Sequence, residues 1–326
     1  MKRLLGIIAI CIIYACETDL PISQIDTVLP NGFPAINYPS DNSPSEERIA
    51  LGKRLFFDPI LSKDSTISCS SCHLQEFAFA DNRAVSPGIE ERLGTRNSMS
   101  LANVAYFDIF LREGGVPNLE MQVLAPIEDH NEMDFNIVSA SEKLKLDSTY
   151  VEQSQTAYNK EPNAFVITRA IAAFERTLVS GNSDYDIGDL STSQQKGKTL
   201  FFSDSLACSS CHGTFLFTNQ TIENNGLYEQ YSDSGRYRLT YLPEDIGKFK
   251  VPSLRNIELT APYMHDGSIE NIEDVISHYE SGGKGHFNQS TLLKGFTLSE
   301  SEKENLIEFL FSLTDNHFIQ NPRFEE

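Results

Sequence analysis

The stretch CSSCH at residues 69–73 recurs unchanged at residues 208–212, and this repeat decides the fold. In a CxxCH motif the two thiols form thioethers with the vinyl groups of a haem, and the histidine on the same helical turn ligates the iron. The preceding residues repeat as well, as GKRLFF at 52–57 and GKTLFF at 197–202. We therefore expect a duplicated module of helix, loop and haem site with two c-type haems. The motifs assign the attachment cysteines Cys69, Cys72, Cys208 and Cys211 and the proximal iron ligands His73 and His212.

Paired cysteines have three other common uses. Two CxxC pairs can bind one zinc ion, but zinc knuckles keep their pairs closer together and need no histidine after each pair. A redox dithiol would stand in a thioredoxin-like βαβ pattern, which surrounds neither pair. A disulfide that closes a two-residue loop would stabilise the fold little. Haem attachment is therefore the favoured interpretation.

The N-terminus predicts export. Two basic residues precede an apolar run at residues 4–15, which is too short to span a bilayer as a stable helix. The run ends in IYAC at residues 13–16, which resembles a bacterial lipoprotein cleavage site. We therefore expect a signal peptide at 1–15, a periplasmic protein and a lipid anchor on Cys16; an ordinary signal peptide with an incidental cysteine is the alternative. Export agrees with the haem motifs, because bacteria attach c-type haem outside the cytoplasm.

The chain is strongly acidic, with a formal net charge of −20 over 326 residues. Such a charge repels nucleic acid, and the sequence has no basic track for phosphates. Solubility explains an acidic surface, which would also suit a basic electron-carrier partner.

The pattern of apolar residues divides the chain into two mainly α-helical domains, and its length suffices for two cores. Residues 16–45 are rich in Pro, Asn, Ser and Asp and are expected to form a flexible tether. An N-terminal haem domain is expected at 46–190 and a C-terminal haem domain at 191–326. The apolar spacing predicts helices that begin near residues 46 and 193 and helices at 137–146, 163–178, 271–280 and 299–313, with long loops at 64–130 and 213–250. Strand signals are sparse, so the expected fold is two cytochrome c-like domains with little strand.

Two further motifs carry a resemblance to a known family. Together with the haem motifs, PSLRN at 252–256 and TAPYMHDG at 260–267 make the chain similar to the bacterial di-haem cytochrome c peroxidase and MauG family over residues 46–315. The resemblance implies a peroxidatic haem in the N-terminal domain, an electron-transfer haem in the C-terminal domain and a calcium ion between them. It also implies hydrogen peroxide as substrate, an electron donor such as a small c-type cytochrome, and association into a homodimer.

The resemblance assigns two residues to the peroxide side of the first haem. Glu132 falls at the position of the family's distal acid, and Gln122 at that of the neighbouring amide. Heterolysis of peroxide requires that one oxygen lose a proton and the other gain it, which a carboxylate above an open iron position can perform. Taken without the family context, Glu132 would be interpreted as a solvated loop acid.

The resemblance also assigns a calcium site. Asn97, Thr260 and Pro262 match its ligands, an amide oxygen and two carbonyl oxygens. Oxygen ligands of low charge suit calcium better than a transition metal. The alternative is that Asn97 is a turn residue.

The sequence departs from the family at both irons. Many members carry a histidine that blocks the peroxidatic iron until reduction, whereas SPGI at 86–89 places Ile89 there, so we expect an iron that is open from the start. Peroxidases of the family generally ligate the second iron with Met, whereas Tyr279 here aligns with the axial Tyr of the MauG branch. A phenolate stabilises ferric and higher states, whereas a thioether raises the potential. Met264 and His278 are rival ligands.

A third departure concerns the route between the haems. The chain has no Trp, and Arg112 stands where the family places an interhaem indole. Arginine cannot carry a hole, so either an aromatic residue among Tyr106, Phe107 and Phe110 or direct tunnelling must connect the haems.

Three functions follow from these observations. The leading hypothesis is a cytochrome c peroxidase that reduces hydrogen peroxide with electrons delivered through the second haem. The alternative is a MauG-like oxidase that uses peroxide to oxidise a protein or organic substrate, which Tyr279 and Ile89 favour. A two-haem electron carrier would want both irons fully ligated, and Glu132 with Gln122 argues against it.

Overall fold

The computed structural model describes residues 29–326, so the predicted signal peptide and Cys16 lie outside the described residues. The helices and strands are α1 (Glu46–Phe57), α2 (Leu119–Gln122), α3 (Leu124–Glu128), α4 (Ile137–Leu144), α5 (Ser148–Tyr158), α6 (Ala164–Glu175), α7 (Asp184–Ile187), α8 (Thr192–Phe201), α9 (Cys208–Cys211), β1 (Ile222–Glu223), α10 (Tyr237–Thr240), β2 (Phe249–Lys250), α11 (Ile272–Glu280), α12 (Glu300–Phe311) and α13 (Asn316–Ile319). Within residues 29–326, no helix is both long and apolar enough to cross a membrane.

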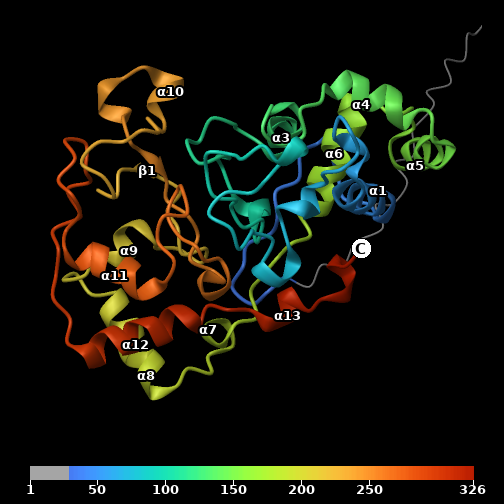
Figure 1. Cartoon of the computed structure of the whole chain (residues 1–326). Coiled ribbons are helices and arrows are strands. Elements are labelled where there is room, and N and C mark those ends of the chain that lie inside the picture. The colour runs from blue at the N-terminus through green and yellow to red at the C-terminus, as the bar shows by residue number, and fades with distance from the viewer. Residues whose placement is uncertain (1–28) are drawn as a thin grey trace, which may run out of the picture.

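The helices gather in two groups that follow the order of the chain (Figure 1). One group holds α1, α4, α5 and α6, and the other holds α8, α9, α11 and α12. The strands β1 and β2 pair antiparallel over two residues, with Ile222 opposite Lys250. Turns and loops make up most of the remainder. The structure thus confirms the prediction of a mainly α-helical chain with little strand.

The duplicated GK-x-LFF sequence corresponds to a duplicated helix crossing. α1 packs on α6, and α8 packs on α12 in the same manner. A Cβ added to Gly52 in α1 would overlap the carbonyl oxygen of Ala170, and one added to Gly197 in α8 would overlap that of Asn305. A residue without a side chain is therefore needed at both crossings, which explains why glycine opens both copies of the repeat.

The phenylalanines of the repeat fill the core beside each crossing. Phe56 packs on Phe174 with 5.2 Å between ring centroids, and Phe201 packs on Phe309 at the same distance. All four side chains are fully buried. Burial of each ring contributes about 1.5–3 kcal/mol, so the repeat supplies the apolar support on which each haem loop rests.

The described part of the predicted tether is not a tether. Within residues 29–45, the Asn42 side chain is buried and donates a hydrogen bond to Glu120 Oε1 at 3.0 Å. The ring of Phe33 lies 4.9 Å from that of Phe215, edge to face. The flexible-tether prediction is therefore wrong for this segment, because a few individual side chains anchor a stretch that has no apolar periodicity.

The C-terminal end of the chain returns to the first group of helices (Figure 1). Phe318 in α13 and Phe324 pack on Phe79, with ring centroids 5.7 and 6.1 Å apart. The last residues of the predicted C-terminal domain, 191–326, thus contribute to the core of the N-terminal half and tie the two halves together.

Candidate functional site

The first CxxCH motif lies on a single turn. Cys69–Ser71 form a 3-10 turn, and the backbone N–H of His73 donates to the carbonyl oxygen of Cys69 at 3.0 Å. His73 Nδ1 lies 2.8 Å from the carbonyl oxygen of Phe79. A proton on Nδ1 that is donated to this carbonyl leaves the lone pair of Nε2 for iron. Burial lowers the pKa of His73, which keeps the imidazole neutral, as ligation requires.

The second motif repeats this arrangement. Cys208–Cys211 form α9, and the backbone N–H of His212 donates to the carbonyl oxygen of Cys208 at 2.9 Å. His212 Nδ1 lies 3.2 Å from the carbonyl oxygens of both Phe217 and Pro252. Burial lowers the pKa of His212 to about 4. The PSLRN motif, which begins at Pro252, thus orients the second proximal histidine.

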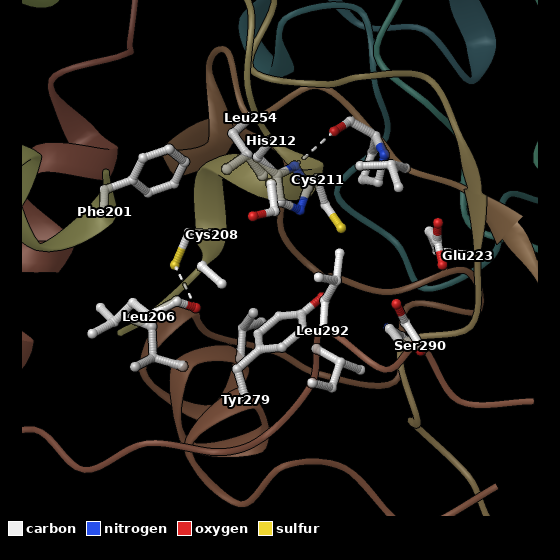
Figure 2. A pocket seen from close by; sticks show the side chains of 18 of the residues that line it. Phe201, Leu206, Cys208, Cys211, His212, Glu223, Leu254, Tyr279, Ser290 and Leu292 are labelled. Atoms are coloured by element: carbon white, nitrogen blue, oxygen red, sulfur yellow. Dashed lines mark hydrogen bonds between the residues drawn. The ribbon is translucent and has the colours of Figure 1, made fainter. Parts of the chain in front are cut away.

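The second motif opens into a cavity of about 450 Å³. Cys208, Cys211 and His212 lie on one side of it, and Tyr279 lies opposite His212 with its ring directed into the cavity (Figure 2). Apolar side chains form much of the remaining wall, among them Leu254, Ile257, Ile276, Leu306 and Leu310. Two thiols can attach a haem covalently, one neutral imidazole can ligate its iron, and an apolar wall can surround its porphyrin. The cavity also leaves room for a sixth ligand.

The three rivals for that sixth position have different surroundings. His278 does not line the cavity, and its Nε2 lies 2.9 Å from the carbonyl oxygen of Asn225. Met264 lines the cavity, but Asn225 Nδ2 donates to its Sδ at 3.2 Å. Tyr279 is held by a hydrogen bond to the Asn225 side chain, and burial raises its pKa to about 12. Asn225, which the sequence did not single out, therefore contacts all three candidates.

In the first half, Ile89 lies against Glu132. The backbone N–H of Ile89 donates to the carbonyl oxygen of Glu132 at 2.9 Å, and the Ile89 side chain is only 1% exposed. A Cβ on Gly88 would lie 2.7 Å from the Cα of Glu132, so glycine is needed for this close approach. The loop that carries a blocking histidine in many relatives is thus fixed beside the candidate distal acid, with a side chain that cannot ligate iron.

The pKa of the Glu132 carboxyl group is raised toward neutrality. The side chain is exposed in this structure, but enough protein lies around the carboxyl group that desolvation, with a smaller effect from the charge of Asp129, raises its pKa to about 7. Glu132 in turn raises the pKa of Cys69 and Cys72, so it lies within electrostatic reach of the first motif. Gln122 ends α2, and among the described residues no hydrogen bond joins it to Glu132.

Asn97 does not offer a free oxygen to calcium. Its Oδ1 accepts a hydrogen bond from Arg112 Nη2 at 2.8 Å, and its carbonyl oxygen accepts one from the same nitrogen at 3.0 Å. Its backbone N–H donates to His265, which places it near the segment that contains Thr260 and Pro262. A calcium ion on Oδ1 would stand beside a guanidinium, and two such positive charges repel strongly in a protein interior. Arg112 therefore competes with calcium for the oxygens of Asn97, and the calcium site that the resemblance implies stays a prediction.

Aromatic side chains meet between the two halves. The rings of Tyr106 and Phe215 lie edge to face at 5.3 Å, and Phe33 packs on both. Phe215 follows His212 by three residues, so the cluster leads from a loop of the first half to the second haem motif. Phe107 and Phe110 lie 6.5 Å apart from each other. Sequence reasoning named Tyr106 but had no signal for Phe33 or Phe215.

Two buried charged residues also escaped sequence reasoning. Glu175 at the end of α6 is fully buried, its Oε2 has no hydrogen-bond partner among the described residues, and burial raises its pKa to about 8. Lys250 in β2 is buried, and burial together with the charge of Arg112 lowers its pKa to about 7. Both residues stand in elements whose apolar pattern indicates only a core position, so no sequence signal marked them.

Comparison with known proteins identifies the relatives of the chain. Residues 46–195 match the family described as di-haem cytochrome c peroxidase. The methylamine utilization protein MauG of Methylorubrum extorquens is 33% identical over 92% of this chain and 86% of its own length. The cytochrome c551 peroxidase of Pseudomonas aeruginosa is 31% identical over 86% of this chain and 81% of its own. Among solved structures, a MauG-like protein associated with microbial copper homeostasis superimposes with a TM-score of 0.88 and 34% identity, over 92% of this chain and 98% of that one.

Proposed function

Since the chain belongs to the bacterial di-haem cytochrome c peroxidase and MauG family and is an oxidoreductase with two c-type haems, we propose that it reduces hydrogen peroxide at the haem held by His73. His212 would hold the second haem, which when bound would supply electron transfer from a donor such as a small c-type cytochrome. When bound, the first haem supplies the iron that binds peroxide and accepts its oxidising equivalents.

The residues of this chain supply the proton transfers. With a pKa of about 7, Glu132 is about half ionised at neutral pH, so it can accept a proton from one peroxide oxygen and return it to the other. On the proximal side, the hydrogen bond from His73 Nδ1 to the carbonyl oxygen of Phe79 holds the imidazole in one orientation. Gln122 is the second polar group assigned to the distal side, and it would orient peroxide by hydrogen bonding.

One observation carries the proposal of a site that needs no reductive activation. Ile89 is buried against Glu132 and bonded to it through the backbone, so the distal loop is anchored and presents no ligand. Turnover of hydrogen peroxide with reduced cytochrome c should therefore be the same before and after pre-reduction of the enzyme. A ferric spectrum with only six-coordinate, low-spin haem, and activity only after pre-reduction, would refute the open site. Absence of turnover with every reductant would favour the electron carrier.

A second candidate function is favoured by Tyr279. It faces His212 across the cavity, and because Asn225 contacts both Tyr279 and Met264, the position of the Tyr279 ring is the observation that favours this residue. A phenolate ligand would make the second haem a poor store of a reducing electron and a better partner for oxidised states, which suits MauG-like oxidation of a protein or organic substrate. In Tyr279→Phe, a changed spectrum of the second haem is expected; an unchanged one would reject this ligand. The Met264→Leu variant is the matched control, with a spectrum expected to stay as in wild type.

We also propose that the protein works outside the cytoplasm, attached to a membrane by a lipid on Cys16. The IYAC sequence and the requirement for haem attachment outside the cytoplasm support this placement. Membrane fractionation of wild type and Cys16→Ser tests it. Wild type should sediment with membranes and the variant should not, and equal distribution of the two would contradict lipidation.

A further inference from the structure

Two basic residues meet on the wall of the second haem cavity. Arg112 comes from a loop of the first half and Lys250 from β2 of the second half, and both line the cavity. The backbone N–H of Lys250 donates to the carbonyl oxygen of Arg112 at 2.6 Å, which holds the two residues side by side. Lys250 is 5% exposed. The first half thus contributes a charged residue to the haem site of the second half.

Neither cation has an anionic partner within residues 29–326. The guanidinium of Arg112 donates to two neutral oxygens of Asn97, and Lys250 Nζ donates to the carbonyl oxygen of Ile109 at 3.2 Å. Lys250 Nζ also lies 4.2 Å from the ring centroid of Phe107. Neither residue forms an ion pair with a described carboxylate, although the charge of Asp266 acts on Arg112 from a distance. The carboxylates that line the same cavity are Asp204 and Glu223.

A neighbouring arginine, by contrast, has carboxylate partners. Arg96 forms ion pairs with both Glu113 and Asp233, so its charge is compensated. Arg112 and Lys250 instead repel one another, and burial, together with this repulsion, lowers the pKa of Lys250 to about 7. Two adjacent, desolvated cations without counter-ions are costly, and a nearby anion with two negative charges would remove that cost.

The haem that Cys208 and Cys211 attach in this cavity brings two such charges, because its porphyrin carries two propionate carboxylates. We propose that Arg112 and Lys250 bind the propionates of the second haem. The apolar wall around Ile276 surrounds the porphyrin, and the two cations meet its charged edge. The proposal rests on the presence of the second haem and is independent of which substrate the enzyme oxidises.

The binding of the propionates has a consequence for the second iron. A positive charge beside a haem disfavours the ferric state, which carries one more positive charge than the ferrous state, and so raises the reduction potential. Arg112 and Lys250 would thus offset part of the lowering that a Tyr279 phenolate would cause. They would keep the second haem reducible by an external donor.

Potentiometric titration of the purified holoprotein, followed by the absorbance and EPR signals of each haem, tests the proposal. In Arg112→Gln and in Lys250→Gln, the reduction equilibrium of the second haem should shift about tenfold toward the ferric state, or about 59 mV to lower potential. The first haem should shift less. The matched control is Arg236→Gln, which removes a cation from the same region: Arg236 donates to the carbonyl oxygen of Glu113 but does not line the cavity.

The outcome is decided by comparison of these variants. A shift of the second haem in both glutamine variants that exceeds the shift in Arg236→Gln, with recovery in Arg112→Lys, supports propionate binding. A second-haem potential that moves no more in Arg112→Gln and Lys250→Gln than in the control overturns it. If Arg112→Gln yields no folded holoprotein, the Lys250→Gln titration decides alone. An unshifted potential with peroxide turnover retained refutes the propionate contacts and leaves the proposed function standing, whereas a wild type that does not turn over peroxide refutes the proposed function and leaves the potential test valid.

Discussion

The rate of reaction with hydrogen peroxide should depend on pH through Glu132. Burial raises the pKa of this carboxyl from its usual 4.5 to about 7, and the proposed mechanism requires the ionised form to accept the first proton. The ionised form of Glu132, which is the reactive one, is therefore lost as the pH falls through 7. Measured as kcat/KM for peroxide, the reaction should therefore be slow at acidic pH and reach a plateau above pH 8.

The magnitude follows from the same pKa. A group with a pKa of about 7 is about one tenth ionised at pH 6 and about nine tenths ionised at pH 8, so kcat/KM should rise about tenfold over this interval. Glu132→Gln keeps the size of the side chain but removes the base, and it should lower kcat/KM by about 10²–10⁴-fold and flatten the profile. Stopped-flow measurement of the first haem's reaction with peroxide isolates this step from electron delivery.

A second variant separates Glu132 from other titrating groups. The charge of Asp129 raises the pKa of Glu132, so Asp129→Asn should move the profile to lower pH and make the enzyme faster at pH 6. An asparagine oxygen can still accept the hydrogen bond from the Asn131 backbone N–H that Asp129 accepts at 2.8 Å. A profile that is flat between pH 6 and 8, or one that stays in place in Asp129→Asn and persists in Glu132→Gln, refutes the assignment.

Four further predictions concern the rest of the structure. Ile89→His should restore a ligand to the distal loop and give a low-spin ferric first haem with activity only after reduction; a high-spin spectrum would show that the loop cannot reach the iron. Gly52→Ala should lower the free energy of unfolding by about 1–3 kcal/mol in denaturant titration, because its Cβ overlaps a carbonyl oxygen of α6, whereas Gly94→Ala, whose Cβ meets nothing closer than 3.8 Å, should change it little. The pKa of Glu175 is about 8 in the folded state and 4.5 in the unfolded state, so the melting temperature of wild type should fall as the pH rises between these values. Glu175→Gln should remove this fall. An equal fall in both proteins would contradict an uncompensated buried carboxyl group. Removal of calcium with EGTA should leave the haem spectra and melting temperature unchanged, because Arg112 occupies the oxygens of Asn97; a drop in melting temperature that calcium reverses would restore the calcium assignment.

Four helices could be predicted from the sequence because their apolar spacing is regular. The predicted helices at 137–146, 163–178, 271–280 and 299–313 correspond to α4, α6, α11 and α12, with ends that differ by up to three residues. α5 was missed, because its buried face combines Tyr150, Ala157 and Tyr158 with the polar Ser154. Its signal was local: Asp147 accepts a hydrogen bond from the backbone N–H of Thr149 and marks the N-terminus of the helix.

The same distinction holds for the residues of the candidate site: those in local motifs could be predicted, and those brought together from distant segments could not. Covalent chemistry at fixed spacing marked both haem motifs, and the family resemblance marked Glu132 and Tyr279. Contacts between distant segments left no such mark. The hydrogen bonds from Arg112 to Asn97 join two loop positions 15 residues apart, and the position of Lys250 beside Arg112 depends on how the two halves dock; no local pattern encodes either. The same docking brings residues 29–45 onto the fold, where composition alone suggested a tether.

The two haem sites share a scaffold but differ in what surrounds them. The α1–α6 and α8–α12 crossings are equivalent, down to the glycine that each requires. Around the first motif, Ile89 withholds a ligand and Glu132 supplies a group that titrates near neutrality. Around the second, Tyr279 faces the proximal histidine, and Arg112 reaches across from the first half. Arg112 also binds Asn97, so one loop of the first half is fixed within its own half and contributes a charged residue to the second haem cavity. The helix crossings therefore make the two sites alike, and the loops around each motif make them different.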